Sequence, residues 1–142
     1  MGKGKELEVS DVMSIEQDEI TAQMRSLFQM LPKELACEGE ADVKRYFCLY
    51  MMLAKADVDF MPSLATGNPD AVLKTNKAIY VFEIMYNQSA EKALARLREK
   101  HYATAFASDG RRVYYVGVNY NPAADVRTID DVKCERAQGE KP

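Results

Sequence analysis

Hydrophobic side chains recur at intervals of three and four residues in three segments of the chain, a spacing typical of helices that bury one face. The first segment covers residues 17–31 and ends at Pro32, which cannot continue a helix. The second covers residues 42–54 and the third covers residues 89–100. Their apolar positions are, in order, Ile20, Met24, Leu27, Phe28 and Leu31; Val43, Tyr46, Phe47, Tyr50, Met51 and Ala54; and Ala90, Ala93, Leu94 and Leu97.

Shorter apolar runs bounded by turn residues predict strands. We expect these strands at residues 58–64, 70–73, 78–85 and 112–119, with a short edge strand at 128–132. The run at 78–85 is apolar on both faces except for Glu83, which predicts a central strand that is buried on both sides.

The order helix, helix, three strands, helix and strand predicts an α/β domain whose central mixed sheet of four to five strands is flanked by helices. We assign this domain to residues 17–135. Residues 1–16 are expected to form a flexible acidic N-terminal segment, and residues 136–142 a disordered tail.

Composition removes several classes of function. The chain has 142 residues and a net charge of -3, which argues against nucleic-acid binding through bulk positive charge. Acids are concentrated in the first 20 residues, so the remainder can still present a local basic patch. We find no apolar run of membrane-spanning length, no secretory signal and three scattered cysteines, so we expect a cytoplasmic protein without membrane contact. With one histidine and no phosphate-binding loop, any catalysis would rest on carboxylates and a metal.

Two acids occur where a carboxylate is costly. Glu83 interrupts the apolar run, and Asp70 opens the strand before it, so a hairpin of these strands would bring the two side chains together. Two close carboxylates repel unless a cation joins them, and oxygen ligands suit Mg²⁺. The alternative is that Asp70 is only a turn residue and that Glu83 pairs with a basic residue. Glu40 also has two interpretations: it either projects from the buried face of the second helix or complements the helix dipole.

Three segments of the chain together resemble the PD-(D/E)XK nuclease superfamily, and more narrowly the nuclease-like domain found C-terminal to AAA-ATPase-like domains in Bacteroidetes proteins. Where that family has G-R-I-D, F-E-F-K and S-A-E-E-A-L-x-Q-I-x-x-K-x-Y, this chain has G-N-P-D at 67–70, F-E-I-M at 82–85 and S-A-E-K-A-L-A-R-L-R-E-K-H-Y at 89–102. The similarity extends over residues 18–132. It implies a restriction-endonuclease-like core and a Mg²⁺- or Mn²⁺-dependent phosphodiesterase acting on DNA.

The resemblance also implies roles for individual residues. Asp70 and Glu83 match the metal-binding acids, the Ile84 carbonyl matches a backbone metal ligand, and Glu40 matches the glutamate that assists the metal site. The family's lysine falls at Met85, which can neither donate a proton nor hold a phosphate, and its helix glutamine falls at Arg96. Because of this degenerate motif, we leave open whether the chain is a weakened nuclease in which Arg96 stabilises phosphate charge, or a non-catalytic module that retains the fold and binds nucleic acid or protein.

A basic stretch follows the central strand. Its candidate phosphate-binding residues are Lys92, Arg96, Arg98 and Lys100. They could follow a DNA backbone, although an ordinary solvated helix face has the same composition. DNA and an AAA-ATPase-like domain or protein are therefore the possible partners. The sequence does not indicate an oligomeric state.

Overall fold

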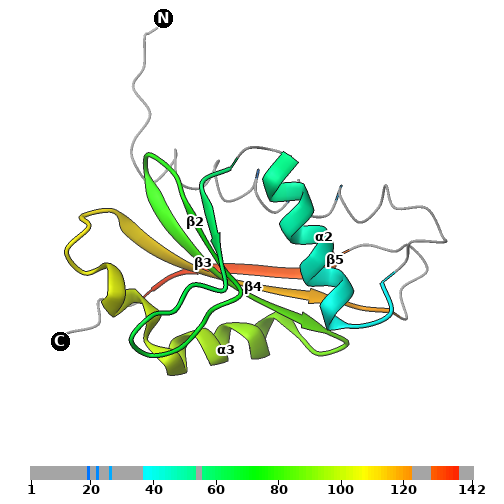
Figure 1. The fold of residues 1–142 in the computed structure, drawn as a ribbon. Coiled ribbons are helices and arrows are strands. Elements are labelled where there is room, and N and C mark those ends of the chain that lie inside the picture. The colour runs from blue at the N-terminus through cyan, green and yellow to red at the C-terminus, as the bar shows by residue number, and fades with distance from the viewer. Residues whose placement is uncertain are drawn as a thin grey trace, which may run out of the picture.

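A five-stranded mixed sheet forms the centre of the protein (Figure 1). The computed structural model describes residues 37–53, 56–122 and 129–137, together with Glu19, Ala22 and Ser26. The elements are α2 (Glu40–Leu53), β1 (Val58–Phe60), β2 (Ala71–Lys74), β3 (Ala78–Tyr86), α3 (Ala90–Lys100), the 3-10 helix η2 (Tyr102–Phe106), β4 (Arg112–Tyr120) and β5 (Ile129–Arg136). The strands lie in sequence order; β3 and β4 are parallel and the other neighbours are antiparallel. The predicted α/β class with a restriction-endonuclease-like core is confirmed.

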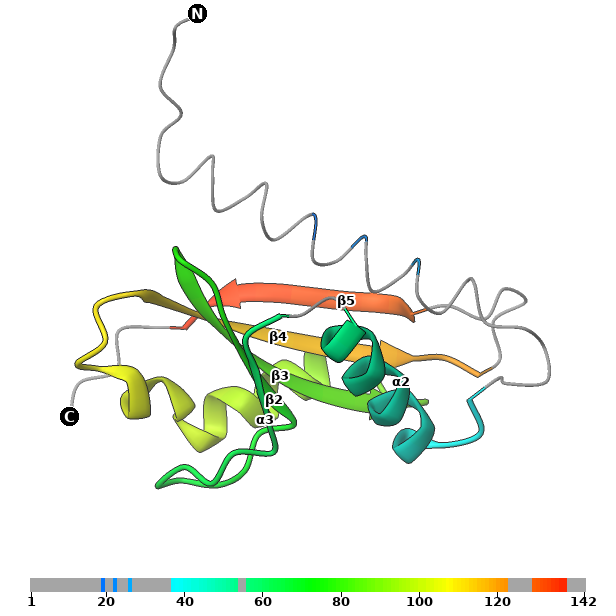
Figure 2. The same cartoon turned by 45° about the horizontal axis from the view of Figure 1, so that its top comes forward.

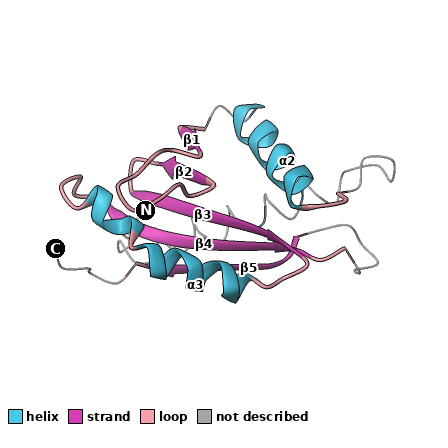
Figure 3. Cartoon of the chain, turned by 60° about the horizontal axis from the view of Figure 1, so that its bottom comes forward, coloured by secondary structure: helices cyan, strands magenta, loops and turns pink. Residues whose placement is uncertain are grey.

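The two long helices pack on opposite faces of the sheet (Figures 1 and 3). Alternation along β3 divides its side chains between two hydrophobic clusters, as expected for a strand with a period of two. Tyr80, Phe82 and Ile84 join the cluster that contains Val43 and Phe47 of α2. Ile79 and Val81 join the cluster that contains Leu94 and Leu97 of α3. β3 is therefore buried on both sides, as its apolar run predicts.

The position of α3 depends on a glycine in β4. Gly117 lies beside Glu83 in the parallel β3–β4 register. A Cβ at Gly117 would lie 2.4 Å from the backbone oxygen of Ala90 and 3.1 Å from both Ala93 Cβ and Leu94 N. The first half of α3 consequently sits closer to the sheet than a side chain at this position would allow.

Both ends of α3 have clear local causes. Ser89 adopts an extended conformation as N-cap, and its side chain accepts a hydrogen bond from the Lys92 N–H at 3.0 Å. His101 ends the helix in the left-handed conformation with φ 50° and donates its N–H to the Arg98 carbonyl. The Arg98 guanidinium in turn contacts Glu135 at 2.7 Å, which ties α3 to β5.

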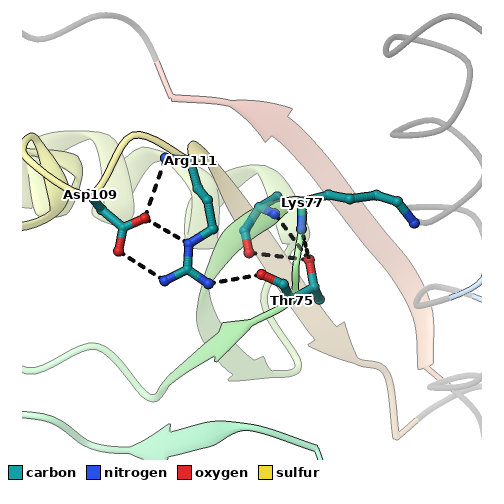
Figure 4. Close-up of polar contacts among 5 residues, drawn as sticks. Thr75, Lys77, Asp109 and Arg111 are labelled. Carbon is teal, nitrogen blue, oxygen red and sulfur yellow. Dashed lines mark hydrogen bonds and ion pairs between the residues drawn. The ribbon is translucent and has the colours of Figure 1, made fainter.

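The β2–β3 loop is bound to the turn before β4 (Figure 4). Thr75 Oγ1 accepts hydrogen bonds from the backbone N–H groups of Lys77 and Ala78 at 3.2 and 3.0 Å. Arg111 donates to the Thr75 carbonyl at 2.8 Å and holds both carboxylate oxygens of Asp109, at 2.6 and 2.8 Å. The hydrogen bonds from Arg111 lower the pKa of Asp109 to about 2.

Several predicted boundaries need correction. β1 ends at Phe60, four residues early, because Met61 adopts a positive φ of 49° before Pro62. β5 is longer than the predicted edge strand and ends at Arg136, and the N–H of the buried Ala137 donates to the Val113 carbonyl.

Some predictions fall largely outside the described residues. These are the helix at residues 17–31, the flexible segment 1–16 and the end of the tail, although Glu19, Ala22 and Ser26 are helical and exposed. Within the described ranges, no helix is long and apolar enough to cross a lipid bilayer.

Candidate functional site

Asp70 and Glu83 come together where the β2–β3 hairpin ends. Ala71 lies opposite Phe82 in the register, so the next pair outward is Asp70 and Glu83. The backbone continues this pairing, because the Asp70 N–H donates to the Phe82 carbonyl at 3.0 Å. The side chain then turns to β3, where Asp70 Oδ2 accepts the Ile84 N–H at 2.7 Å. The predicted hairpin therefore places the two acids side by side at one sheet end.

The segment before Asp70 holds it in this position. The Met61 N–H donates to the Asp70 carbonyl at 3.0 Å, and the Asn68 side-chain amide donates to the Pro62 carbonyl at 3.0 Å. Gly67, at φ 145°, packs against Tyr102, whose hydroxyl would lie 3.1 Å from a Cβ at this position. Asp70 is thus anchored from both sides, although residues 61–70 form no regular strand.

A lysine that the sequence analysis did not single out contacts Asp70. Lys44 extends from α2 and places Nζ 2.9 Å from Asp70 Oδ1 and 3.0 Å from Glu40 Oε2. The only sequence signal for this contact is the four-residue spacing of Glu40 and Lys44, which is common on helix surfaces. Lys44 therefore links Glu40 to Asp70.

Arg96 pairs with the second acid from the opposite face of the sheet. Its Nη1 lies 3.2 Å from Glu83 Oε2, so a residue at the border of the apolar stripe of α3 does reach the site. The Glu83 side chain is 10% exposed and the Arg96 side chain is 51% exposed. The structure thus contains the pairing of Glu83 with a basic residue, which was the alternative interpretation of this acid. It also contains the predicted convergence of Asp70 and Glu83.

The charges are coupled. Burial raises the pKa of Glu83, the nearby Asp70 carboxylate raises it further, and Arg96 and Lys44 oppose the shift. Burial acts to lower the pKa of Lys44, but its hydrogen bonds to Asp70 and Glu40 outweigh that effect, so the pKa is raised overall. Lys44 is accordingly a fixed positive charge at neutral pH, while Glu83 is an acid whose charged form depends on its neighbours.

Glu40 and Met85 differ from simple expectations. Glu40 is the first residue of α2, but its side chain is 48% exposed rather than directed into the buried face with Val43. It reaches the acid pair through Lys44. Met85 is 2% exposed within β3, so the thioether at the family's lysine position is a packing group.

The oxygen donors of the site suit a hard divalent cation. Besides the two carboxylates, the Ile84 carbonyl leaves β3 on the Asp70 side, because the N–H and C=O of one strand residue point to the same neighbour. Lys44 and Arg96 contact the carboxylates in this structure, so a metal ion would have to share or displace these contacts. In the described part of the chain, no three His, Cys, Asp or Glu side chains form a ready metal-binding group.

The candidate phosphate-binding residues on α3 are not equivalent. Lys92 and Lys100 are exposed, and Lys92 Nζ contacts the Gln88 side chain at 3.0 Å. Arg98 is held by Glu91 and Glu135, which raise its pKa, so its guanidinium serves the contact between α3 and β5. Arg96 is the residue of this set that contacts the acid pair.

The mixed sheet between two helices, with paired acids at the end of a central hairpin, defines a nuclease-like α/β core. A model of the PD-(D/E)XK nuclease superfamily matches residues 38–129, more than half of the chain. The chain therefore belongs to the PD-(D/E)XK nuclease superfamily, whose members generally use divalent metals. A comparison with curated proteins gave no significant match.

Proposed function

We propose that this chain is a nuclease-like domain of the metal-dependent phosphodiesterase type that acts on DNA, with hydrolysis weakened by Met85. Asp70, Glu83 and the Ile84 carbonyl would hold Mg²⁺ or Mn²⁺. Such an ion supplies a Lewis acid and lowers the pKa of bound water. The observation that carries the proposal is the convergence of Asp70 and Glu83, two carboxylates of which each is only 10% exposed. Burying two neighbouring carboxylates lowers the stability of a fold, and such an arrangement is typical of a functional site.

Arg96 would bind phosphate at this site. A guanidinium has five N–H donors, so Arg96 can contact Glu83 and a phosphate oxygen together. It holds phosphate well but does not transfer protons at neutral pH. The exposed Lys92 and Lys100 on the same helix would extend the contact along the DNA backbone.

The test is nicking of supercoiled plasmid DNA in Mn²⁺ and Mg²⁺. We expect slow metal-dependent nicking by the wild type, and a loss of about 100-fold or more in Asp70→Asn and Glu83→Gln, because the metal ligands are removed. Asp59→Asn is the matched control, since Asp59 is exposed on the edge strand β1. Equal nicking by the wild type and Asp70→Asn would refute the proposal.

A second candidate is a non-catalytic module that binds DNA or a protein partner, such as an AAA-ATPase-like domain. It is favoured by the contacts of Lys44 and Arg96, which already neutralise both acids without a metal. Calorimetric titration with Mn²⁺ separates the candidates. Heat of binding that disappears in Asp70→Asn supports the nuclease-like site, and absence of binding at millimolar Mn²⁺ supports the module.

A further inference from the structure

We propose that Lys44 supplies the phosphate-binding ammonium group that this site lacks at Met85. The inference deepens the proposed function and rests on it. The role assigned to Lys44 is to contact a phosphate oxygen of the DNA beside Asp70 and to stabilise the negative charge that grows there during hydrolysis. Lys44 keeps its proton throughout, so it need not serve as a general acid.

The contacts of Lys44 place its positive charge beside Asp70, one of the two proposed metal ligands. Its Nζ lies 2.9 Å from Asp70 Oδ1, while the other oxygen of the same carboxylate is fixed by the Ile84 N–H at 2.7 Å. A phosphate bound through a metal on Asp70 would therefore arrive within reach of this ammonium group. Lys44 would then lie next to the reacting phosphate without any movement of α2 relative to the sheet.

The backbone that presents Lys44 is well anchored. The preceding residue, Val43, is fully buried, and Phe47, one turn later, is 1% exposed in the core beneath α2. Glu40, one turn earlier, holds the ammonium group from the solvent side at 3.0 Å. Lys44 is thus a directed side chain rather than a freely moving surface lysine.

Lys44 is also accessible, whereas Met85 is not. The Lys44 side chain is 31% exposed, and Met85 is 2% exposed with no donor group. An ammonium group has three N–H donors, and the contacts to Asp70 and Glu40 use two of them. The third donor therefore remains for a phosphate oxygen.

Arg96 does not replace this role. It approaches Glu83 from α3, on the face of the sheet opposite to α2. The acid pair is therefore flanked by one cation from each face, Lys44 on Asp70 and Arg96 on Glu83. Two cations on different sides of one phosphate neutralise different oxygens. We therefore expect the loss of either cation to lower the rate of DNA cleavage even when the other is present.

The experiment measures single-turnover DNA cleavage in Mn²⁺ at saturating protein. Lys44→Met keeps an apolar stem but removes the charge, and we expect a loss of about 100-fold, the cost of removing one preorganised donor. Lys44→Arg retains the charge and should keep cleavage within about tenfold of the wild type, well above Lys44→Met. The matched control is Arg45→Met on the same helix, whose 69% exposed side chain pairs with Asp42; we expect no change.

The decisive variant is Lys44→Met combined with Met85→Lys. Returning an ammonium group to the family's position should recover at least about tenfold of the lost rate, because the site would again have a donor for the phosphate. A purely structural ion pair between α2 and Asp70 could not be restored from β3. Unfolding curves for every variant show whether it is folded, and Lys44→Arg carries the test if Lys44→Met does not fold.

The outcomes distinguish a failure of the role assigned to Lys44 from a failure of the proposed nuclease function. Cleavage by the wild type that is unaffected in Lys44→Met overturns the role of Lys44 and leaves the metal site standing. A loss that Met85→Lys fails to recover in folded protein also overturns it. No metal-dependent cleavage by the wild type overturns the proposed function and this inference together.

Discussion

Replacement of Gly117 by alanine tests how closely α3 is seated on the sheet. The added Cβ would lie 2.4 Å from the Ala90 carbonyl oxygen, whereas an ordinary contact begins near 3.4 Å. The helix must therefore retreat by roughly 1 Å, and a backbone oxygen cannot move aside as a side chain can. Overpacking of this kind costs about 1–3 kcal/mol, and we expect a value at the upper end because two further atoms, in Ala93 and Leu94, lie at 3.1 Å.

Urea unfolding, followed by circular dichroism, gives the free energy of unfolding of this variant. The control is Gly39→Ala, because nothing lies within 4 Å of a Cβ there. Gly39 precedes α2 directly, so that change should cost no more than about 1 kcal/mol through the N-cap preference. Gly117→Ala with the stability of the wild type would show that α3 does not approach β4 as closely as described. The same retreat moves Arg96 from Glu83, so cleavage should fall as well.

Three further changes have defined outcomes. Ser89→Ala removes the N-cap of α3 and should lower the free energy of unfolding by about 1 kcal/mol. Phe47→Ala empties a site that is 1% exposed and should cost about 3–5 kcal/mol. The Asp109 carboxyl should titrate near pH 2 by NMR, and Arg111→Gln should return its pKa toward 3.8. Because this pKa is lowered by folding, the stabilisation by Asp109 is complete above about pH 4 and is lost as the pH falls toward 2.

Each of these changes has a matched control. Ser108→Ala alters an exposed serine without a cap, and Leu49→Ala truncates a side chain that is half exposed on the same helix as Phe47. Both should stay within about 0.5 kcal/mol of the wild type. A titration midpoint for Asp109 near 3.8 in the wild type would contradict the bidentate contact with Arg111.

The sequence predicts those parts of the fold in which local signals agree. β3 is correctly expected as a central strand, because eight consecutive positions leave no exposed face, and α3 is expected from its stripe and its Ser89 cap. β1 is predicted too long, because the apolar pattern continues past Met61 while its positive φ ends the strand. The backbone conformation of one residue is not encoded in the hydrophobic pattern, so such ends are found only in the structure.

The candidate site also has features that the sequence predicts and contacts that it does not. The position of Asp70 opposite Glu83 follows from alternation and a hairpin, both of which are local. The contact between Lys44 and Asp70 joins different elements, and a lysine on an amphipathic helix has the same pattern whether it is solvated or paired. Arg96 lies outside the apolar stripe of α3, and the length of its side chain allows it to reach Glu83.

The hairpin that joins Asp70 to Ile84 closes only 14 residues, whereas the parallel pairing of β3 with β4 must wait for the whole of α3 and η2 to cross the sheet. Short closures cost less chain entropy and precede long ones, and the Lys44–Asp70 contact spans a longer segment than the hairpin, so we expect the two carboxylates to meet before α2 docks. At that stage, Lys44 has not arrived to offset the charge of Asp70. A divalent cation that binds these acids would therefore compete with Lys44 less in the nascent hairpin than in the folded domain.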